Sequence, residues 1–293
     1  MAPRTILMTG GNRGLGRAAA EKLAAAGHRI LLTARDAGQG RRAAAEIEAA
    51  TGSSNVAVEE VDLASFDAVR ALAARLVERE TPIDVLFHNA GIMQQSPTRR
   101  VTGAGFEETL AVNALAPFLL TRCLLPALER APSARVVFVT SRLHLPGSRS
   151  VPVDFDFSDP QLTRGYHPER AYKNSKLAVL WLAYELARRL PPRPITSNAV
   201  CPGFVPATAQ ASTTGFTRFL LRYILPVMPF ARSVEEAATS YAFMATDPSL
   251  EGRTGKFYGE MKELASSPDS YDLEKAGRFW QLACELTGVE DWP

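Results

Sequence analysis

The feature that most constrains the fold is a regular alternation of short apolar runs with longer amphipathic segments. The apolar runs, each interpreted as a strand buried on both faces, cover residues 5–9, 29–34, 56–61, 85–88, 135–140 and 196–200. The amphipathic segments, each interpreted as a helix, cover residues 18–26, 39–50, 66–78, 107–129, 171–190 and 234–244. This alternation predicts an α/β fold, a doubly wound parallel sheet with helices on both faces and ligands at the carboxyl ends of the strands.

The totals of the sequence narrow the class of protein further. A length of 293 residues suits one large domain, so we predict a single Rossmann-type domain over residues 1–293, with insertions that cover a substrate at about 142–170 and 202–232. The net charge of +2 argues against nucleic acid as a partner. Three scattered cysteines and four histidines without metal-ligand spacing indicate a reducing, cytoplasmic setting and no metal site. No stretch approaches the ~20 apolar residues of a membrane span, so we expect no transmembrane segment.

Glycines cluster directly after the first predicted strand, where a helix is expected to begin. Glycine allows a tight turn and a close approach of the backbone to a phosphate, and the start of a helix offers free N–H groups. An ordinary turn would also use glycines, but the position in the first unit of a doubly wound sheet favours a dinucleotide site. The candidate cofactor residues of this turn are Gly10, Asn12, Arg13, Gly14, Leu15 and Gly16.

The end of the second strand indicates which dinucleotide binds. An acidic side chain there would bind the ribose 2′-hydroxyl of NAD, whereas an arginine accommodates the 2′-phosphate of NADP. This chain has Ala34 and Arg35 there, Arg13 lies near in the glycine turn, and the competing carboxylate, Asp36, lies beyond Arg35. We therefore predict NADP(H), with ordinary surface arginines as the alternative. Asp62, after the third strand, is either an adenine ligand or a turn or capping residue of the next helix.

Tyr172 and Lys176 are four residues apart near the start of a predicted helix, so they share one face of it. A lysine ammonium beside a phenol favours the phenolate, lowers its pKa from about 10 and suits it to proton transfer near neutral pH. Tyr258 and Tyr271 have the same spacing to a lysine, but the first lies in a predicted strand and the second opens a C-terminal helix that no strand precedes. Only Tyr172 follows a strand whose end carries a serine, Ser141.

The motifs also occur in a characteristic order. Thr9-Gly10-x-x-x-Gly14-x-Gly16 is followed by Asn89-Ala90-Gly91, Asn113, Ser141, Tyr172-x-x-x-Lys176 and Pro202-Gly203. This ordered set resembles the short-chain dehydrogenase/reductase family over about residues 4–260. The helix 171–190, the insertion before it and the C-terminal tail are most similar to the retinol dehydrogenase and protochlorophyllide reductase branch.

The resemblance implies roles for the matching residues. Tyr172 would give a proton to a carbonyl oxygen, and Lys176 would lower the pKa of Tyr172 and hold the nicotinamide ribose. Ser141 would hydrogen-bond the carbonyl oxygen and stabilise its developing charge, and Asn113 would hold a water that connects Lys176 to solvent. The further cofactor contacts that it implies are Asp62, Leu63, Asn89, Ala90, Gly91, Tyr172, Lys176, Pro202, Gly203 and Val205. The alternative for the catalytic set is a core tyrosine, a strand-end serine and a helix asparagine.

Three positions depart from the family pattern. His88 stands where the family often has an asparagine, so the turn near the adenosine is expected to differ. Thr208 follows Pro202-Gly203 one place later than the threonine that usually contacts the carboxamide. The separation of Ser141 and Tyr172 is long, although this branch tolerates an insertion there.

The segments that follow the fifth and sixth strands are predicted to contact the substrate. The candidates are Leu143, His144, Phe204, Phe216 and Phe219. A site lined mostly by apolar side chains with a few polar groups suits a small-molecule substrate, a bulky apolar carbonyl or alcohol. The apolar stretch around Phe216 could equally be a core helix, a dimer interface or, with its interspersed arginines, a surface in peripheral contact with a membrane.

We therefore predict an NADPH-dependent reductase of an apolar carbonyl, or the reverse alcohol dehydrogenase, with Tyr172 as general acid/base. Reduction of an activated C=C bond would use the same tyrosine and lysine and is the nearest alternative. A non-catalytic NADP(H)-binding sensor or scaffold is the third, but it would not need Ser141. Members of the family commonly form dimers through the helices that correspond to residues 107–129 and 171–190. A homodimer interface is therefore the alternative to burial of Trp181 and Tyr184 in the core.

Overall fold

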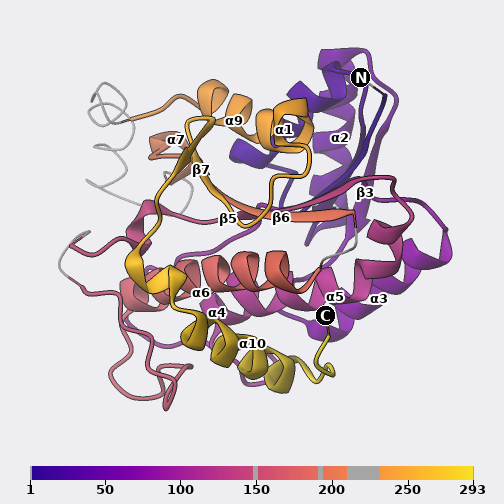
Figure 1. Cartoon of the computed structure of the whole chain (residues 1–293). Coiled ribbons are helices and arrows are strands. Elements are labelled where there is room, and N and C mark those ends of the chain that lie inside the picture. The colour runs from indigo at the N-terminus through magenta and orange to yellow at the C-terminus, as the bar shows by residue number, and fades with distance from the viewer. Residues whose placement is uncertain (1, 148–150, 191–193, 210–230, 293) are drawn as a thin grey trace.

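The structure, a computed structural model, is organised around one sheet with the strand order β3-β2-β1-β4-β5-β6-β7-β8 (Figure 1). Residues 2–147, 151–190, 194–209 and 231–292 are described. The strands are β1 (Thr5–Met8), β2 (Arg29–Ala34), β3 (Val56–Glu60), β4 (Val85–His88), β5 (Ala134–Val139), β6 (Ile195–Cys201), β7 (Phe257–Gly259) and β8 (Lys262–Leu264). Neighbours are parallel from β3 to β7, and β8 is antiparallel to β7. The predicted doubly wound parallel sheet is confirmed, and β8 is an addition to it.

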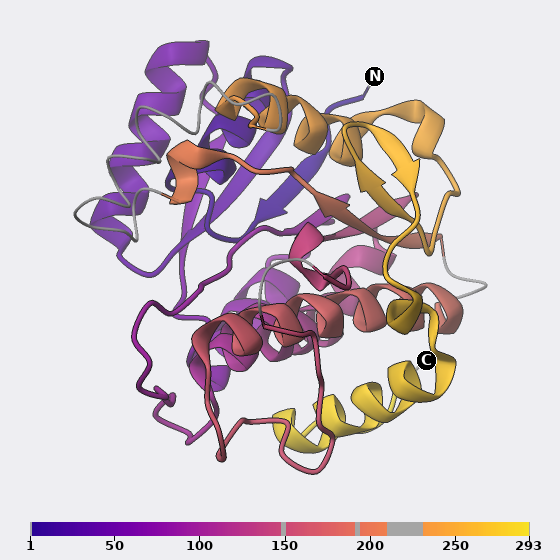
Figure 2. The ribbon, with the colours of Figure 1, turned by 90° about the vertical axis from the view of Figure 1, so that its left-hand side faces the viewer.

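Helices cover both faces of this sheet. The helices are α1 (Gly14–Ala25), α2 (Ala37–Thr51), α3 (Phe66–Glu78), α4 (Glu108–Leu110), α5 (Ala116–Glu129), α6 (Pro168–Arg189), α7 (Pro206–Ala209), α9 (Val234–Thr246) and α10 (Leu273–Thr287). Strand residues alternate between two apolar clusters: Ile6 and Met8 pack in the cluster that contains α1 and α9, whereas Leu7 packs in the cluster of α3, α5, α6 and α10. Figure 2 shows α6 and α10 side by side on one face of the sheet.

The strand order reverses between β1 and β4. The chain crosses to β2 after β1 and to β5 after β4, so the connections leave in opposite directions at their carboxyl ends. In open α/β sheets ligands bind at such a switch point, because the diverging loops leave a crevice there. The predicted cofactor turns after β1 and β4 both lie at this place.

Several helices begin at other residues than predicted: α1 begins at Gly14 instead of residue 18, and α2 at Ala37 instead of residue 39. The helix α6, which carries Tyr172 and Lys176, begins at Pro168 instead of residue 171, because proline suits the first helical position and the His167 side chain accepts a hydrogen bond from the Glu169 N–H at 3.3 Å. Tyr172 therefore lies in the second turn of α6. The C-terminal helix begins at Leu273, after a 3₁₀ turn, η7 (Pro268–Tyr271), that contains Tyr271.

The predicted helix 107–129 is interrupted by a π-helical turn, η1 (Ala111–Leu115), between α4 and α5. Pro117 accounts for the interruption, since it has no N–H for the carbonyl of Asn113, four residues earlier, and its ring would clash with that carbonyl in a regular α-helix. The N–H of Ala116 bonds the carbonyl of Ala111 instead, five residues back. The sequence thus places a widened turn at Asn113, and such turns are frequent at functional sites.

The outer faces of α5 and α6 are buried by the C-terminal segment. The Trp181 side chain is 1% exposed, and its indole N–H donates to the Asp269 carbonyl at 2.8 Å. The rings of Phe118 on α5 and Trp280 on α10 meet edge to face at 5.0 Å. Trp181 is therefore a core residue, and Tyr184 is partly buried against the same core. Pairing of two chains through α5 and α6 would require α10 to move.

The helical run Glu108–Glu129 is long and apolar enough to cross a membrane by length and composition, which corrects the expectation that no stretch approaches such a span. However, 83% of its most apolar 18-residue window is buried inside the fold. Core helices of soluble proteins pass the same test, so this finding is weak evidence for a membrane span.

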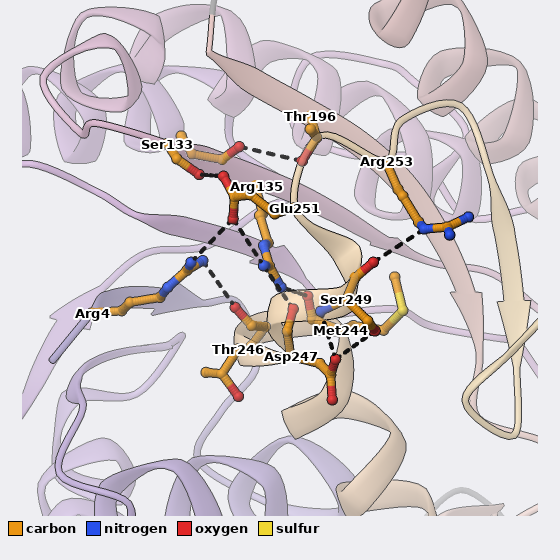
Figure 3. Close-up of polar contacts among 12 residues, drawn as sticks. Arg4, Ser133, Arg135, Thr196, Met244, Thr246, Asp247, Ser249, Glu251 and Arg253 are labelled. Carbon is orange, nitrogen blue, oxygen red and sulfur yellow. Dashed lines mark hydrogen bonds and ion pairs between the residues drawn. The ribbon is translucent and has the colours of Figure 1, made fainter. Parts of the chain in front are cut away.

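A buried arginine cluster fixes the far end of α9, at the edge of the sheet where the strands begin (Figure 3). Arg135 on β5 is 3% exposed and donates to the carbonyls of Asp247, at 2.8 Å, and Met244, at 3.3 Å. The Glu251 carboxylate lies 3.4 Å from Arg135 and 3.6 Å from Arg4. Carbonyls at a helix C-terminus lack helical partners and carry partial negative charge, so arginines stabilise this end.

Candidate active site

The turn between β1 and α1 is held by side chains from neighbouring strands. The Gly10 N–H donates to Thr33 Oγ1 at 3.1 Å, and the Asn89 side-chain amide donates to the carbonyls of Thr9 at 2.9 Å and Gly10 at 3.1 Å. The Ala90 N–H donates to Thr9 Oγ1 at 3.0 Å. Asn89 and Ala90 therefore join the turns after β1 and β4 into one unit.

Gly16 leaves no room for a side chain. A Cβ there would lie 2.5 Å from Asn89 Nδ2 and 2.6 Å from the Gly10 carbonyl oxygen, both far inside van der Waals contact. Gly10 itself has φ +63°, which favours glycine. Arg13 caps α1 without a side-chain hydrogen bond, so the first N–H groups of the helix stay available to a ligand. This cradle fits a dinucleotide pyrophosphate.

Arg13 and Arg35 are exposed at this end of the sheet, and neither forms an ion pair within the described part of the chain. The competing carboxylate of Asp36 is already engaged, because it caps α2 by accepting the Gln39 N–H at 2.9 Å. Ala34 is buried at 3% exposure and has no polar side chain to offer a ribose. The cationic groups at the predicted adenosine-ribose position are therefore free to receive a phosphate.

Asp62 lies in the turn after β3. Its carboxylate accepts the Ala64 N–H at 3.0 Å, whereas the capping residue of α3 is Ser65, which accepts the Ala68 N–H at 3.3 Å. The capping alternative for Asp62 is therefore wrong and the turn role is correct. Contact of Asp62, or of the half-buried Leu63, with adenine stays a prediction.

Tyr172 and Lys176 lie together beside the end of β5. Lys176 Nζ is 5.6 Å from the centroid of the Tyr172 ring and donates to the Val139 carbonyl at 2.9 Å. Thr140 Oγ1 donates in turn to the Lys176 carbonyl at 2.9 Å. Two hydrogen bonds thus join this turn of α6 to the end of β5, and the next residue along the chain is Ser141.

Lys176 is the titrating group that the fold perturbs most clearly at this site. It is 4% exposed, and burial lowers the pKa of its ammonium to about 8 because desolvation disfavours the charged form. A lysine whose pKa approaches neutrality exchanges its proton readily near physiological pH. This suits a group that assists proton transfer.

Asn113 lies behind Lys176 in the π-helical turn. Its Oδ1 accepts the Ile92 N–H at 2.8 Å, and its Nδ2 donates to the Ile92 carbonyl at 2.9 Å and to Ser175 Oγ at 3.0 Å. A Cβ on Gly91 would lie 3.3 Å from Lys176 Nζ and 3.4 Å from Asn113 Oδ1, so the turn after β4 passes close to both. Both amide N–H groups and one lone pair of Oδ1 are thus engaged. The Asn113 backbone carbonyl, which cannot accept the usual α-helical N–H because residue 117 is proline, is a further acceptor for a water.

Ser141 begins a 3₁₀ turn, η2 (Arg142–His144), after β5. Its hydroxyl accepts the Leu143 N–H at 3.3 Å. His144 was predicted to contact the substrate, but its side chain is 1% exposed and its ring lies perpendicular to that of Phe257 at 5.4 Å. The structure thus places His144 beneath the turn and away from an open surface, whereas Leu143 is half-buried.

The segment after β6 is described at its two ends. Phe204 pairs with Ala231 as an isolated bridge, and the Arg232 N–H donates to the Phe204 carbonyl at 2.8 Å. Gly203 has φ +83°, and a Cβ there would lie 2.8 Å from Arg232 Cδ. Val205 is buried. Phe216, Phe219 and the side chain of Thr208 lie outside the described residues.

His88 faces the interior instead of the adenosine turn. Its Nε2 lies 2.8 Å from Thr121 Oγ1 on α5, and its ring stacks on Phe138 at 4.8 Å. Burial lowers the pKa of His88 to about 3, so it is neutral at ordinary pH. Asn89, one residue later, makes the contacts to the glycine turn.

The pattern Tyr172-x-x-x-Lys176 assigns no role to the three residues between the tyrosine and the lysine. Lys173 binds the Val151 carbonyl and forms an ion pair with Glu169 at 3.0 Å. Asn174 Nδ2 donates to the Asp154 carbonyl at 2.6 Å, and its Oδ1 accepts the Asp154 N–H at 3.2 Å. These contacts anchor residues 151–154 of the insertion on α6. Ser175 Oγ donates to the Tyr172 carbonyl at 2.7 Å. The three-residue spacing of these two residues on a helix was the sequence signal for this contact.

Known proteins with similar sequences and structures match almost the whole chain. Residues 4–153 match a family described as short chain dehydrogenase, and residues 159–256 match one described as enoyl-(acyl carrier protein) reductase. Retinol dehydrogenase 13 of Homo sapiens is 34% identical over 290 residues, which cover 98% of this chain and 85% of that protein.

Solved structures give the same result. An uncharacterised protein from Mycobacterium paratuberculosis has a TM-score of 0.77 and 29% identity, with 100% of this chain and 96% of that chain covered. The Pseudomonas aeruginosa RhlG/NADP active-site complex has a TM-score of 0.67 and 25% identity, with 88% and 95% covered. The sequence match over half of the chain and the 34% identity to a full-length relative settle the family: this chain belongs to the short-chain dehydrogenase/reductase family of oxidoreductases and is similar to retinol dehydrogenases.

Proposed function

We propose that this protein is an NADPH-dependent oxidoreductase that reduces the carbonyl of a bulky apolar substrate, or oxidises the matching alcohol, with Tyr172 as general acid/base. The observation that carries the proposal is the placement of Lys176 Nζ 5.6 Å from the Tyr172 ring centroid, at the carboxyl end of β5. A buried ammonium beside a phenol stabilises the phenolate that remains after proton donation. A protein that only bound a dinucleotide would need no such pair.

The residues divide the reaction between them. The nicotinamide cofactor supplies the hydride when bound. Tyr172 gives its phenolic proton to the carbonyl oxygen, and the Ser141 hydroxyl donates a hydrogen bond to the same oxygen as negative charge develops there. Lys176 stabilises the Tyr172 phenolate and can replace its proton, because its pKa of about 8 is close to neutral. The backbone carbonyl of Asn113, which Pro117 leaves without the usual α-helical donor, is the acceptor that would hold a water for this relay.

Preference for NADP(H) over NAD(H) is supported by three features of the adenosine end. Arg35 and Arg13 supply cationic forks that suit a phosphate, Ala34 offers no ribose acceptor, and the carboxylate of Asp36 is engaged as a helix cap. RhlG, a structural relative, is recorded with NADP at its active site.

The substrate class is supported by the apolar residues after β6 and by the name of the relative retinol dehydrogenase 13, since retinol is an apolar alcohol. A second candidate is reduction of an activated C=C bond, which the match of residues 159–256 to an enoyl reductase family favours. Both reactions would use Tyr172 as the proton donor, so analysis of the product separates them.

A test of the proposal is NADPH consumption with a panel of apolar aldehydes, ketones, quinones and enones. We expect Tyr172→Phe to bind NADPH normally and to lose most turnover, and Tyr184→Phe, a matched change on the same helix, to keep it. Near-normal turnover by Tyr172→Phe would remove Tyr172 from the mechanism. Arg35→Ala should weaken NADPH far more than NADH, whereas Arg42→Ala on α2 should not change this preference; equal weakening of both cofactors would refute the phosphate role.

The cellular setting is also a proposal. A cytoplasmic protein is supported by the three cysteines, all of which are free thiols. Peripheral contact with a membrane is the alternative, because the predicted substrate is apolar. Fractionation of cells that produce the full chain distinguishes the two.

A further inference from the structure

The turn that carries Ser141 rests on a buried histidine. His144 lies three residues after Ser141 at the end of the 3₁₀ turn, and its Nδ1 is within hydrogen-bonding distance of the Ser141 carbonyl oxygen. The His144 ring also packs edge to face against the ring of Phe257 on β7, with the two centroids 5.4 Å apart. His144 thus contacts both the backbone of Ser141, which follows β5, and Phe257 on β7, the second strand along from β5 in the sheet.

The chemistry of this contact fixes the state of the imidazole. A carbonyl oxygen only accepts hydrogen bonds, so the proton must lie on Nδ1 of His144, which donates to Ser141. Burial lowers the pKa of His144 and so favours the neutral ring. Nε2 is then an acceptor, and among the described residues it has no hydrogen-bond partner. The imidazole therefore makes one directed polar contact in the described part of the chain, and that contact is to Ser141.

The contact matters because of how the Ser141 hydroxyl is used. The hydroxyl accepts a hydrogen bond from the Leu143 N–H at 3.3 Å, which leaves its own proton for donation. The direction of that donation depends on the backbone of Ser141, which the His144 contact restrains. The backbone of the turn is also held by the His144 N–H, which donates to the Ser141 carbonyl at 3.2 Å, and by the Leu145 N–H, which donates to the Arg142 carbonyl at 3.0 Å. The His144 imidazole adds a second donor to the Ser141 carbonyl and ties it to a buried ring that packs on Phe257.

We propose that His144 is a positioning residue that holds Ser141 in the orientation needed to donate to the substrate oxygen. This inference rests on the proposed function of Ser141 and extends the machinery to a residue that touches neither substrate nor cofactor. Its effect must therefore pass entirely through Ser141.

The test is a double-mutant cycle in kcat with the full chain. Asparagine can place its amide N–H near the position of Nδ1, whereas leucine has no donor, so His144→Asn and His144→Leu form a matched pair. We expect His144→Leu to lower kcat by about tenfold to a hundredfold, as a small misplacement of a catalytic group does, and to leave the NADPH Kd unchanged. His144→Asn should restore most of the lost turnover. In a Ser141→Ala background, His144→Leu should have no further effect on kcat.

The outcomes separate this inference from the proposed function. If Ser141→Ala leaves kcat unchanged, the proposed role of Ser141 fails. If Ser141→Ala lowers kcat but His144→Leu lowers it by the same factor in both backgrounds, the positioning role is refuted. Equal losses in His144→Asn and His144→Leu would also refute it, since the donor would then be irrelevant. If His144→Leu does not fold, His144→Gln, whose amide reaches the Nε2 position, takes its place in the cycle.

Discussion

Gly16→Ala is the change that tests the cofactor turn most directly. The added Cβ would lie 2.5 Å from Asn89 Nδ2 and 2.6 Å from the Gly10 carbonyl oxygen. The backbone at Gly10 cannot move easily, so the side-chain amide of Asn89 must move away from the new Cβ. Asn89 would then lose its hydrogen bonds to the Thr9 and Gly10 carbonyls, at 2.9 and 3.1 Å.

The size of the effect follows from these contacts. Each of the two hydrogen bonds contributes about 1 kcal/mol net, and a forced overlap in a packed region costs about 1–3 kcal/mol. Alanine recovers about 0.5–1 kcal/mol, because Gly16 lies within α1 and alanine is the better helix former. We expect the free energy of unfolding to fall by about 2–4 kcal/mol. Domains are stable by about 5–15 kcal/mol, so the variant should stay folded and measurable.

The assay pairs urea unfolding with NADPH titration, and Gly277→Ala is the control. Gly277 lies in α10, and a Cβ there would meet nothing within 4 Å. The same substitution should therefore raise stability by about 0.5–1 kcal/mol at this position and leave the NADPH Kd unchanged. Gly16→Ala should weaken NADPH by more than about tenfold, since 1.4 kcal/mol of lost turn geometry already gives that factor. If Gly16→Ala were as stable as the parent and bound NADPH equally well, the packing argument for this turn would be wrong.

Two further predictions concern stability. Arg135→Met should lower the free energy of unfolding by about 2–4 kcal/mol, because the carbonyls of Asp247 and Met244 lose a buried charged donor. The control Arg253→Ala changes an exposed arginine and should cost under about 1 kcal/mol. Equal losses of the two variants in urea unfolding would contradict the role of burial. Burial lowers the pKa of Lys176 from 10.5 to about 8. Between these two pH values the unfolded chain therefore binds more protons than the folded chain. The free energy of unfolding of the cofactor-free protein should rise by about 3 kcal/mol in all as the pH rises from about 8 to 10.5. Lys176→Met should lack this gain, and parallel pH curves for the two proteins would refute it.

The sequence predicted the buried parallel strands and the amphipathic helices, and it missed an exposed edge strand and the break in one helix. Parallel strands are nearly continuous apolar runs, so six of them were located within a residue or two at each end. The strand β8 (Lys262–Leu264) is exposed at all three positions and has no apolar run to mark it. The break at Asn113 had a local cause in Pro117, which the apolar pattern of the helix concealed. Composition cannot tell a buried histidine from an exposed one, so the burial of His144 against Phe257 was not predicted.

The candidate catalytic residues could be selected from the sequence because their order along the chain is specific to the family, but the contacts that hold them in place could not. On a helix, Tyr172 and Lys176 face the site, while the three residues between them face other elements. Lys173 and Asn174 bind the backbone of the insertion at Val151 and Asp154, and Ser175 binds Asn113 in the π-helical turn. A rotation or slip of this turn of α6 would break contacts with two other segments at once. The positions that a Tyr-x-x-x-Lys pattern leaves open therefore hold the tyrosine and lysine in place, and this fixed geometry is what proton transfer to a bound carbonyl requires.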